Sequence, residues 1–283
     1  MASDGRESGG AHIESWLDEL GRESERRFTR SRRLIDYGEY LREVTREPEV
    51  HVRDAATWLV DAFEHFGTRE VAYPWGDEVR FNLFDQQFSG GGDPLVGQER
   101  VQTEFYRALK GFVRDGRPMR MILLHGPNGS SKSTFVNCVM RAMEYYSSLD
   151  EGARYRFNWV FPKELTGSGK LGFNTSKDGL MPGGSLARLE DQDVEARLSC
   201  ELKDHPLLVL PRKERMEFLD SIESDTWSRK VPDLLSRSGL CPKCKLVFDA
   251  LMTSYRGDLR KVLGHVQVER YFVSRGYRRA AVT

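Results

Sequence analysis

Gly126-Pro127-Asn128-Gly129-Ser130-Ser131-Lys132-Ser133-Thr134 is the stretch that decides the predicted fold. It follows the phosphate-binding pattern G-x-x-x-x-G-K-[ST], except that Ser131 stands where the second glycine is expected. In such a loop, backbone N–H groups and the N-terminus of the following helix attract an anion. Lys132 is then expected to reach the β- and γ-phosphates of ATP as the catalytic residue, and Ser133 to ligate Mg²⁺. The alternative is an ordinary Gly-Ser turn.

The segments on either side of this loop predict the fold class. Met119–Leu124 is a short apolar run that is typical of a strand, and Ser133–Tyr146 has the apolar spacing of a helix. Apolar residues then alternate from Tyr155 to Phe161, which predicts a second strand. A strand, a loop, a helix and a strand in this order form a βαβ unit. We therefore predict an α/β fold of the P-loop NTPase, AAA+-like type: a parallel sheet with flanking helices.

The chain upstream of the loop has a different pattern. Val52 to Phe66 forms a helical apolar stripe that ends at Gly67, a favoured helix C-cap. Ser89–Pro94 is rich in glycine and is the best candidate for a domain boundary. We therefore predict a helical N-terminal region over 1–88 and an AAA-type nucleotide-binding domain over 89–283.

Val96 and Gly97 lie about thirty residues before the loop and resemble the segment that packs on adenine in AAA+ ATPases. An ordinary helix entry has the same appearance. No Walker B segment follows, because Leu207–Leu210 runs into Pro211 and Leu246–Asp249 is followed by Ala250 instead of a second acidic residue. The general base therefore has no assigned residue, and the chain is expected to hold a nucleotide even if it does not hydrolyse it.

Several segments together resemble the PrkA family of bacterial serine protein kinases, specifically its AAA-type N-terminal domain. They are the 126–134 loop, Tyr155–Phe161, Asp193–Arg197, Pro206–Leu208 and, most strongly, His265–Ser274 with the Tyr277-Arg278 pair. The similarity extends from the region of Ser31 to Thr283.

This resemblance implies a function. Such proteins bind ATP and transfer its γ-phosphate to a serine or threonine hydroxyl of a protein substrate. Members of the family are considerably longer, so the chain is expected to be truncated before the Walker B segment. Its expected partners are then the missing C-terminal portion or other copies of itself. The alternatives are a nucleotide-binding regulatory module without turnover and a fragment of an AAA+ ATPase that remodels proteins.

The cysteines suggest a second site. Cys241 and Cys244 form a C-x-x-C pair, and Cys200 with His205 lies about forty residues earlier. Two cysteines at this spacing can point at one ion, so these four residues are a candidate structural Zn²⁺ site. Ordinary reduced cysteines and a redox pair remain the alternatives.

Composition limits the remaining classes of protein. Lys and Arg number 43 and Asp and Glu number 43, so the formal net charge is zero and nucleic acid is not an expected partner. The longest apolar runs fall far short of the ~20 residues that a membrane span needs. The N-terminus lacks the apolar core of a secretion signal. We therefore expect a cytoplasmic protein without a membrane association.

Overall fold

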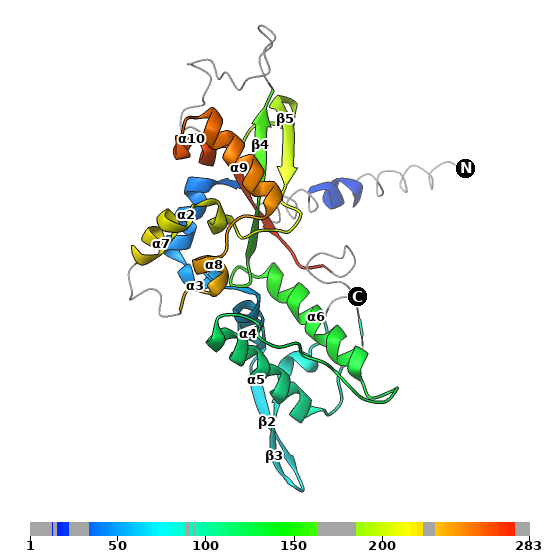
Figure 1. Ribbon diagram of the computed structural model, residues 1–283. Helices are drawn as coiled ribbons and strands as arrows, with labels where there is room; N and C mark the ends of the chain where they lie inside the picture. The colour runs from blue at the N-terminus through cyan, green and yellow to red at the C-terminus, as the bar shows by residue number, and fades with distance from the viewer. Residues whose placement is uncertain are drawn as a thin grey trace, which may run out of the picture.

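The computed structural model describes residues 13, 16–22, 34–88, 91–92, 94–163, 185–222 and 230–274. Those between 34 and 274 form two bodies, which Figure 1 shows one above the other. The upper body contains a four-stranded sheet with helices packed on it, and the lower body contains helices and a β-hairpin.

The sheet of the upper body is entirely antiparallel. Its strands lie in the order β1 (Leu34–Asp36), β6 (Val266–Tyr271), β4 (Arg154–Pro162) and β5 (Val194–Ser199). In the register of this sheet, Val268 of β6 lies opposite both Ile35 of β1 and Phe157 of β4. The two central strands therefore come from parts of the chain more than a hundred residues apart.

The predicted parallel P-loop sheet is wrong. β4 forms where the alternation predicted a strand, but both of its neighbours, β5 and β6, run antiparallel to it. Because these two strands occupy both edges of β4, the Met119–Leu124 run has no edge of that strand to pair with. The run forms no strand, and Met121 and Leu123 are 87% and 79% exposed. Ile122 and Leu124 instead pack against the helices of the lower body.

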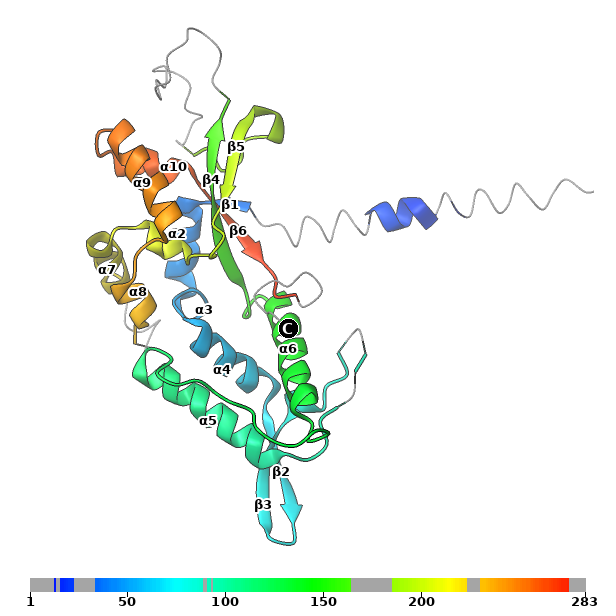
Figure 2. The same ribbon diagram turned by 45° about the vertical axis from the view of Figure 1, so that its right-hand side comes forward.

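Four helices lie on the same side of the sheet in both ribbon views (Figures 1 and 2). They are α2 (Tyr37–Arg46), α7 (Arg212–Asp220), α9 (Pro242–Ser254) and α10 (Leu259–Gly264). Shorter elements complete this body: α3 (Pro48–His51), α8 (Asp233–Arg237), η2 (Asp191–Asp193) and η3 (Pro206–Val209). The core between the helices and the sheet includes Tyr40, Phe157, Trp159, Leu207 and Val268.

The lower body is built around aromatic side chains. It consists of α4 (Ala55–Phe66), the hairpin of β2 (Thr68–Tyr73) and β3 (Gly76–Phe81), η1 (Asn82–Phe84), α5 (Glu99–Asp115) and α6 (Lys132–Ser148). Phe63 of α4 contacts the rings of Phe81, Phe84 and Phe105. The helix α4 ends at Gly67 with a positive φ of 69°, as the sequence predicted.

Arg80 connects the hairpin to α5. Its guanidinium is 2.6 Å from a carboxylate oxygen of Asp85 and 2.6 Å from one of Glu99, the first residue of α5. Arg80 also donates hydrogen bonds to the carbonyl oxygens of Leu95 and Gly97. Because Arg80 and Glu99 are both buried, this ion pair fixes the start of α5 against the hairpin.

The two bodies meet where β6 ends. The Arg270 guanidinium lies 2.7 Å from Asp150 and donates to the carbonyl oxygens of Ser148 and Leu149 at the C-terminal end of α6. A cation at this end of a helix interacts favourably with the helix dipole. Arg270 therefore joins the sheet to the helix that begins at the predicted phosphate loop.

The Ser89–Pro94 segment, predicted as a domain boundary, lies partly outside the described residues, at 89, 90 and 93. Segments before and after it share both cores. β1 pairs with β6, and α4 packs on α5 and α6. In the part of the chain that the structure describes, no helix is long and apolar enough to cross a membrane.

Candidate functional site

The 126–134 loop leads directly into α6, as predicted. Gly126 and Gly129 have positive φ angles of 157° and 77°, which glycine adopts without strain. Ser131 is the N-cap residue of α6 and adopts a left-handed conformation, with φ 60° and ψ 18°. Its side chain makes no capping hydrogen bond, so the N–H groups of the first helical turn have neither this cap nor an acceptor within the helix.

Lys132 is the first residue of α6, and its side chain folds back onto the loop. The Lys132 Nζ donates to the carbonyl oxygens of Gly126 at 2.8 Å and Pro127 at 2.6 Å, and contacts the Ser130 hydroxyl at 3.0 Å. This arrangement places the ammonium group inside the curve of the loop, next to the N-terminus of a 17-residue helix.

The loop forms one end of a cavity of about 1130 Å³. The cavity lies between α5 and the segment that returns from α5 to α6, and Figure 2 shows this segment running alongside α5. Its volume is slightly above the ~300–1,000 Å³ range that is usual for ligand pockets. The apolar part of its lining includes Val101, Phe105, Ala108, Phe112, Ile122 and Leu124.

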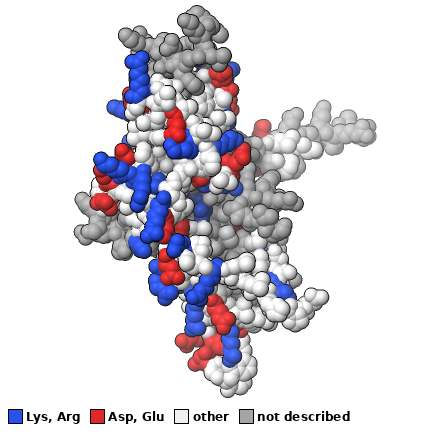
Figure 3. All heavy atoms as spheres, viewed as in Figure 1, with Lys and Arg blue, Asp and Glu red and all other residues white. Residues whose placement is uncertain are grey.

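The charged groups around the cavity are mostly cationic. Five basic side chains and two acidic ones line it: Arg107, Lys110, Arg114, Arg120, Lys132, Glu104 and Asp115. Two of the cations form ion pairs, Lys110 with Glu64 at 3.1 Å and Arg114 with Asp115 at 3.2 Å. Over α5, α7 and α8, basic and acidic side chains are interspersed on the face shown in Figure 3. The excess of positive charge at the cavity favours an anionic ligand.

The predicted nucleotide-site residues are only partly brought together. Gly126, Pro127, Ser130, Ser131 and Lys132 line the cavity, whereas Asn128, Gly129, Ser133 and Thr134 do not. Ser133 is exposed on the first turn of α6.

The predicted adenine segment lies apart from the cavity. Neither Val96 nor Gly97 lines it, although the neighbouring Gln98 does. Val96 is 84% exposed, and the Gly97 carbonyl accepts hydrogen bonds from Arg80 and Gln102.

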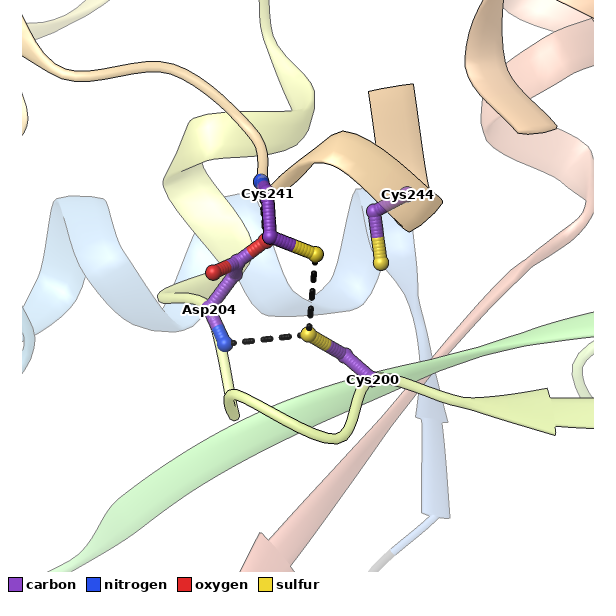
Figure 4. Close-up of side chains that lie close together, drawn as sticks. All are labelled: Cys200, Asp204, Cys241 and Cys244. Atoms are coloured by element: carbon purple, nitrogen blue, oxygen red, sulfur yellow. Dashed lines mark hydrogen bonds between the residues drawn. The ribbon is translucent and has the colours of Figure 1, made fainter. Parts of the chain in front are cut away.

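The second candidate site is a cluster of three cysteines and one aspartate (Figure 4). Cys200 follows the end of β5, Asp204 lies in the next turn, and Cys241 and Cys244 lie at the start of α9. One ligand atom from each residue lies within 4.8 Å of the others. Cys241 is the N-cap of α9, so the helix start turns both of its cysteines toward Cys200.

The three thiols have unequal proton affinities. A hydrogen bond from the Cys244 thiol lowers the pKa of Cys200 to about 6 and raises the pKa of Cys244 itself. Burial raises the pKa of Cys241. Cys200 is therefore the most acidic thiol of the cluster.

His205, the predicted fourth ligand, lies outside this cluster. Its Nε2 is 2.8 Å from the His51 carbonyl oxygen, and its Nδ1 accepts the Leu207 N–H at 3.2 Å. Burial lowers the pKa of His205 to about 4, so the ring is neutral at pH 7. Both ring nitrogens have protein partners, and Asp204, not His205, lies in the cluster with the three cysteines.

Comparisons with known proteins found no match to this chain. No family model matches the chain, and no curated protein or solved structure matches it either. The resemblance to the PrkA family therefore stays a prediction from the residues quoted above.

Asp204 was missed by sequence reasoning. The available signal was weak: an acidic residue four positions after Cys200, directly before the histidine that a zinc pattern favours. Only the turn after β5, which places the Asp204 carboxylate 2.7 Å from the Cys241 N–H, brings this side chain to the C-x-x-C pair.

Proposed function

We propose that this chain binds the triphosphate of a nucleotide, ATP with Mg²⁺, at the 126–134 loop and the adjoining cavity. One observation carries the proposal: the Lys132 ammonium and the N-terminus of α6 lie together beside a large cavity whose charged side chains are mainly cationic. A triphosphate needs both a positive charge and backbone N–H donors. The proposal does not depend on a parallel sheet.

The residues of the loop fit this ligand. Lys132 would exchange its contacts with Gly126 and Pro127 for phosphate oxygens, and the N–H groups of the first turn of α6 would donate to the same oxygens. Ser133 has an exposed hydroxyl one residue after Lys132, in the position that ligates Mg²⁺ in phosphate-binding loops. The apolar wall formed by Phe105, Phe112 and Ile122 would accept the base.

Transfer of the γ-phosphate to a protein serine or threonine is the further step that the resemblance to the PrkA family supports. In that reaction, Lys132 would stabilise the charge on the transferred group, and Mg²⁺ would bridge the phosphates. Binding without turnover, as in a regulatory module, is the alternative.

Calorimetric titration of the full chain with Mg·ATP tests the proposal. Lys132→Ala should weaken binding at least about tenfold, because a hydrogen bond to a charged group contributes about 1.5–3 kcal/mol. Lys245→Ala is the matched control, since Lys245 lies on α9 and pairs with Asp249. Equal ATP affinity of the folded Lys132→Ala variant and the wild type would refute the site. Addition of a protein substrate and γ-labelled ATP to the same sample then separates transfer from binding.

A further inference from the structure

The spacing of the sulfur atoms in the cysteine cluster matches a tetrahedral metal site. Cys200 Sγ and Cys241 Sγ are 3.9 Å apart. Zn–S bonds of about 2.3 Å in a tetrahedron place neighbouring sulfurs about 3.8 Å apart, whereas a disulfide requires about 2.05 Å. The four ligand atoms of the cluster all lie within 4.8 Å of one another. Shortening the longest of these distances by about 1 Å gives the spacing of a tetrahedral site.

Backbone and side-chain N–H groups surround the sulfur atoms. The Asp204 N–H donates to Cys200 Sγ at 3.3 Å. Trp159 is 1% exposed and belongs to the same core cluster as Cys244, and its indole Nε1 has no hydrogen-bond partner among the described residues. A buried N–H without an acceptor is costly, and a metal-bound thiolate at Cys244 would supply the acceptor.

Asp204 supplies the fourth ligand position. Its Oδ2 accepts the Cys241 N–H at 2.7 Å, which orients the carboxylate toward the start of α9. A carboxylate has further acceptor capacity after one such bond, so Asp204 can cap α9 and ligate a cation at the same time. His205 cannot take this position without giving up its bonds to His51 and Leu207.

From this convergence we propose that Cys200, Asp204, Cys241 and Cys244 bind one structural Zn²⁺ ion. Three sulfur ligands select zinc over Mg²⁺ and Ca²⁺, which prefer oxygen. Four protein ligands close the coordination sphere, which is the arrangement of structural zinc sites. The proposal is independent of nucleotide binding.

The ion would connect three parts of the upper body. It would join the end of β5 to the start of α9 and hold the turn that leads into η3. Leu207 and Leu208 of η3 belong to the core beneath the sheet. Loss of the ion should therefore loosen this core, not only the cluster itself.

Metal analysis of the purified full chain is the first test, and about one zinc per chain is expected. After removal of zinc with a chelator, titration with Co²⁺ should give the absorption bands of a tetrahedral cobalt–thiolate complex. The thermal unfolding temperature should fall on chelation and recover when Zn²⁺ is added. A zinc-free chain with all four thiols titratable in the folded state would overturn the proposal. A Cys241–Cys244 disulfide in the purified chain would overturn it too and indicate a redox pair.

Variants identify the ligands. Cys200→Ser and Cys241→Ser should each lose the zinc, whereas Cys138→Ser should keep it because Cys138 lies on α6 outside the cluster. Asp204→Asn retains an acceptor for the Cys241 N–H but removes the charge, so zinc affinity should fall about tenfold or more. Full zinc retention in any of these three ligand variants would remove that residue from the site. His205→Asn separates the two assignments: zinc is retained if Asp204 is the ligand, and zinc loss from a folded His205→Asn chain would overturn the proposed ligand set.

Discussion

Cys200 and Cys241 bring their sulfur atoms to 3.9 Å across 41 positions of sequence. Each of the two residues is placed by its own element of secondary structure. Cys200 directly follows the end of β5. Cys241 is the N-cap of α9, and Pro242 occupies the first helical turn, where proline is well tolerated. The contact therefore depends on where β5 ends and where α9 begins, so the cluster forms only when both elements are in place.

Leu123→Ser tests the position of the segment before the phosphate loop. Leu123 is 79% exposed, so the substitution should change the free energy of unfolding by less than about 0.5 kcal/mol. In a central parallel strand, the same change would cost about 3 kcal/mol or more. Urea denaturation measures the difference, and Leu207→Ser is the matched control because Leu207 is 0% exposed. A large loss for Leu123→Ser would contradict the exposed position of this side chain.

Local elements could be predicted from the sequence, but their pairing could not. The helix after the loop, the alternation of β4 and the end of α4 at Gly67 all follow from short-range patterns. The strand β6 does not, because Gln267, Glu269 and Arg270 give it the composition of a surface segment although the structure buries them. Glu269 is paired with Arg156 at 2.8 Å, a contact across 113 positions that no local pattern contains.

The candidate sites were predictable to a similar extent. The motif located the loop from Gly126 to Lys132, because phosphate binding depends on neighbouring residues in the sequence. The cysteine cluster depends on a turn instead. Asp204 bonds to Cys241 and His205 bonds to His51, and these partners lie on other segments of the chain. Spacing alone therefore could not predict that Asp204, and not the adjacent His205, lies in the cluster with the three cysteines.

Gly129→Ala and Ser131→Gly should shift stability in opposite directions. Gly129 has φ 77° with open space around a built Cβ, so alanine meets only backbone strain and should cost about 1–2 kcal/mol. Ser131 already bears such strain at φ 60° and makes no capping bond. Glycine at this position relieves the strain, but it also gives the unfolded chain more conformational freedom, which offsets part of the effect. The free energy of unfolding should therefore rise by up to about 1 kcal/mol. Urea denaturation of both variants checks this, and equal destabilisation would contradict the loop conformation.

Arg80→Met should be among the most destabilising single changes in the lower body. It leaves Glu99, which is 5% exposed, without its ion-pair partner, and breaking a buried pair costs about 3–5 kcal/mol. Adding Glu99→Gln removes the unpaired charge and should recover part of the loss. A double-mutant cycle measured by urea denaturation gives the coupling between the two residues. Additive effects would show that the pair contributes nothing beyond its separate contacts.

The stability of the protein should fall on mild acidification through His265. This ring is 3% exposed, its Nδ1 lies 2.7 Å from the Val160 carbonyl oxygen, and its Nε2 lies 2.7 Å from the Tyr255 hydroxyl. Because a carbonyl only accepts, Nδ1 carries the proton and Nε2 accepts from Tyr255. Burial lowers the pKa of His265 below its ordinary value of 6.5. The unfolded chain therefore binds this proton at a higher pH than the folded chain does.

The sign of the effect follows from this difference in proton binding. Stability from His265 is fully present above pH 6.5 and is lost as the pH falls below that value, because the unfolded state then takes up the proton first. His265→Asn keeps an N–H that can donate to Val160 and removes the titration. Unfolding free energies at pH 7.5 and 5.5 should therefore differ less in this variant than in the wild type, since all other titrating groups are shared. An equal pH dependence in the two proteins would mean that the pKa of His265 is the same in the folded and the unfolded chain.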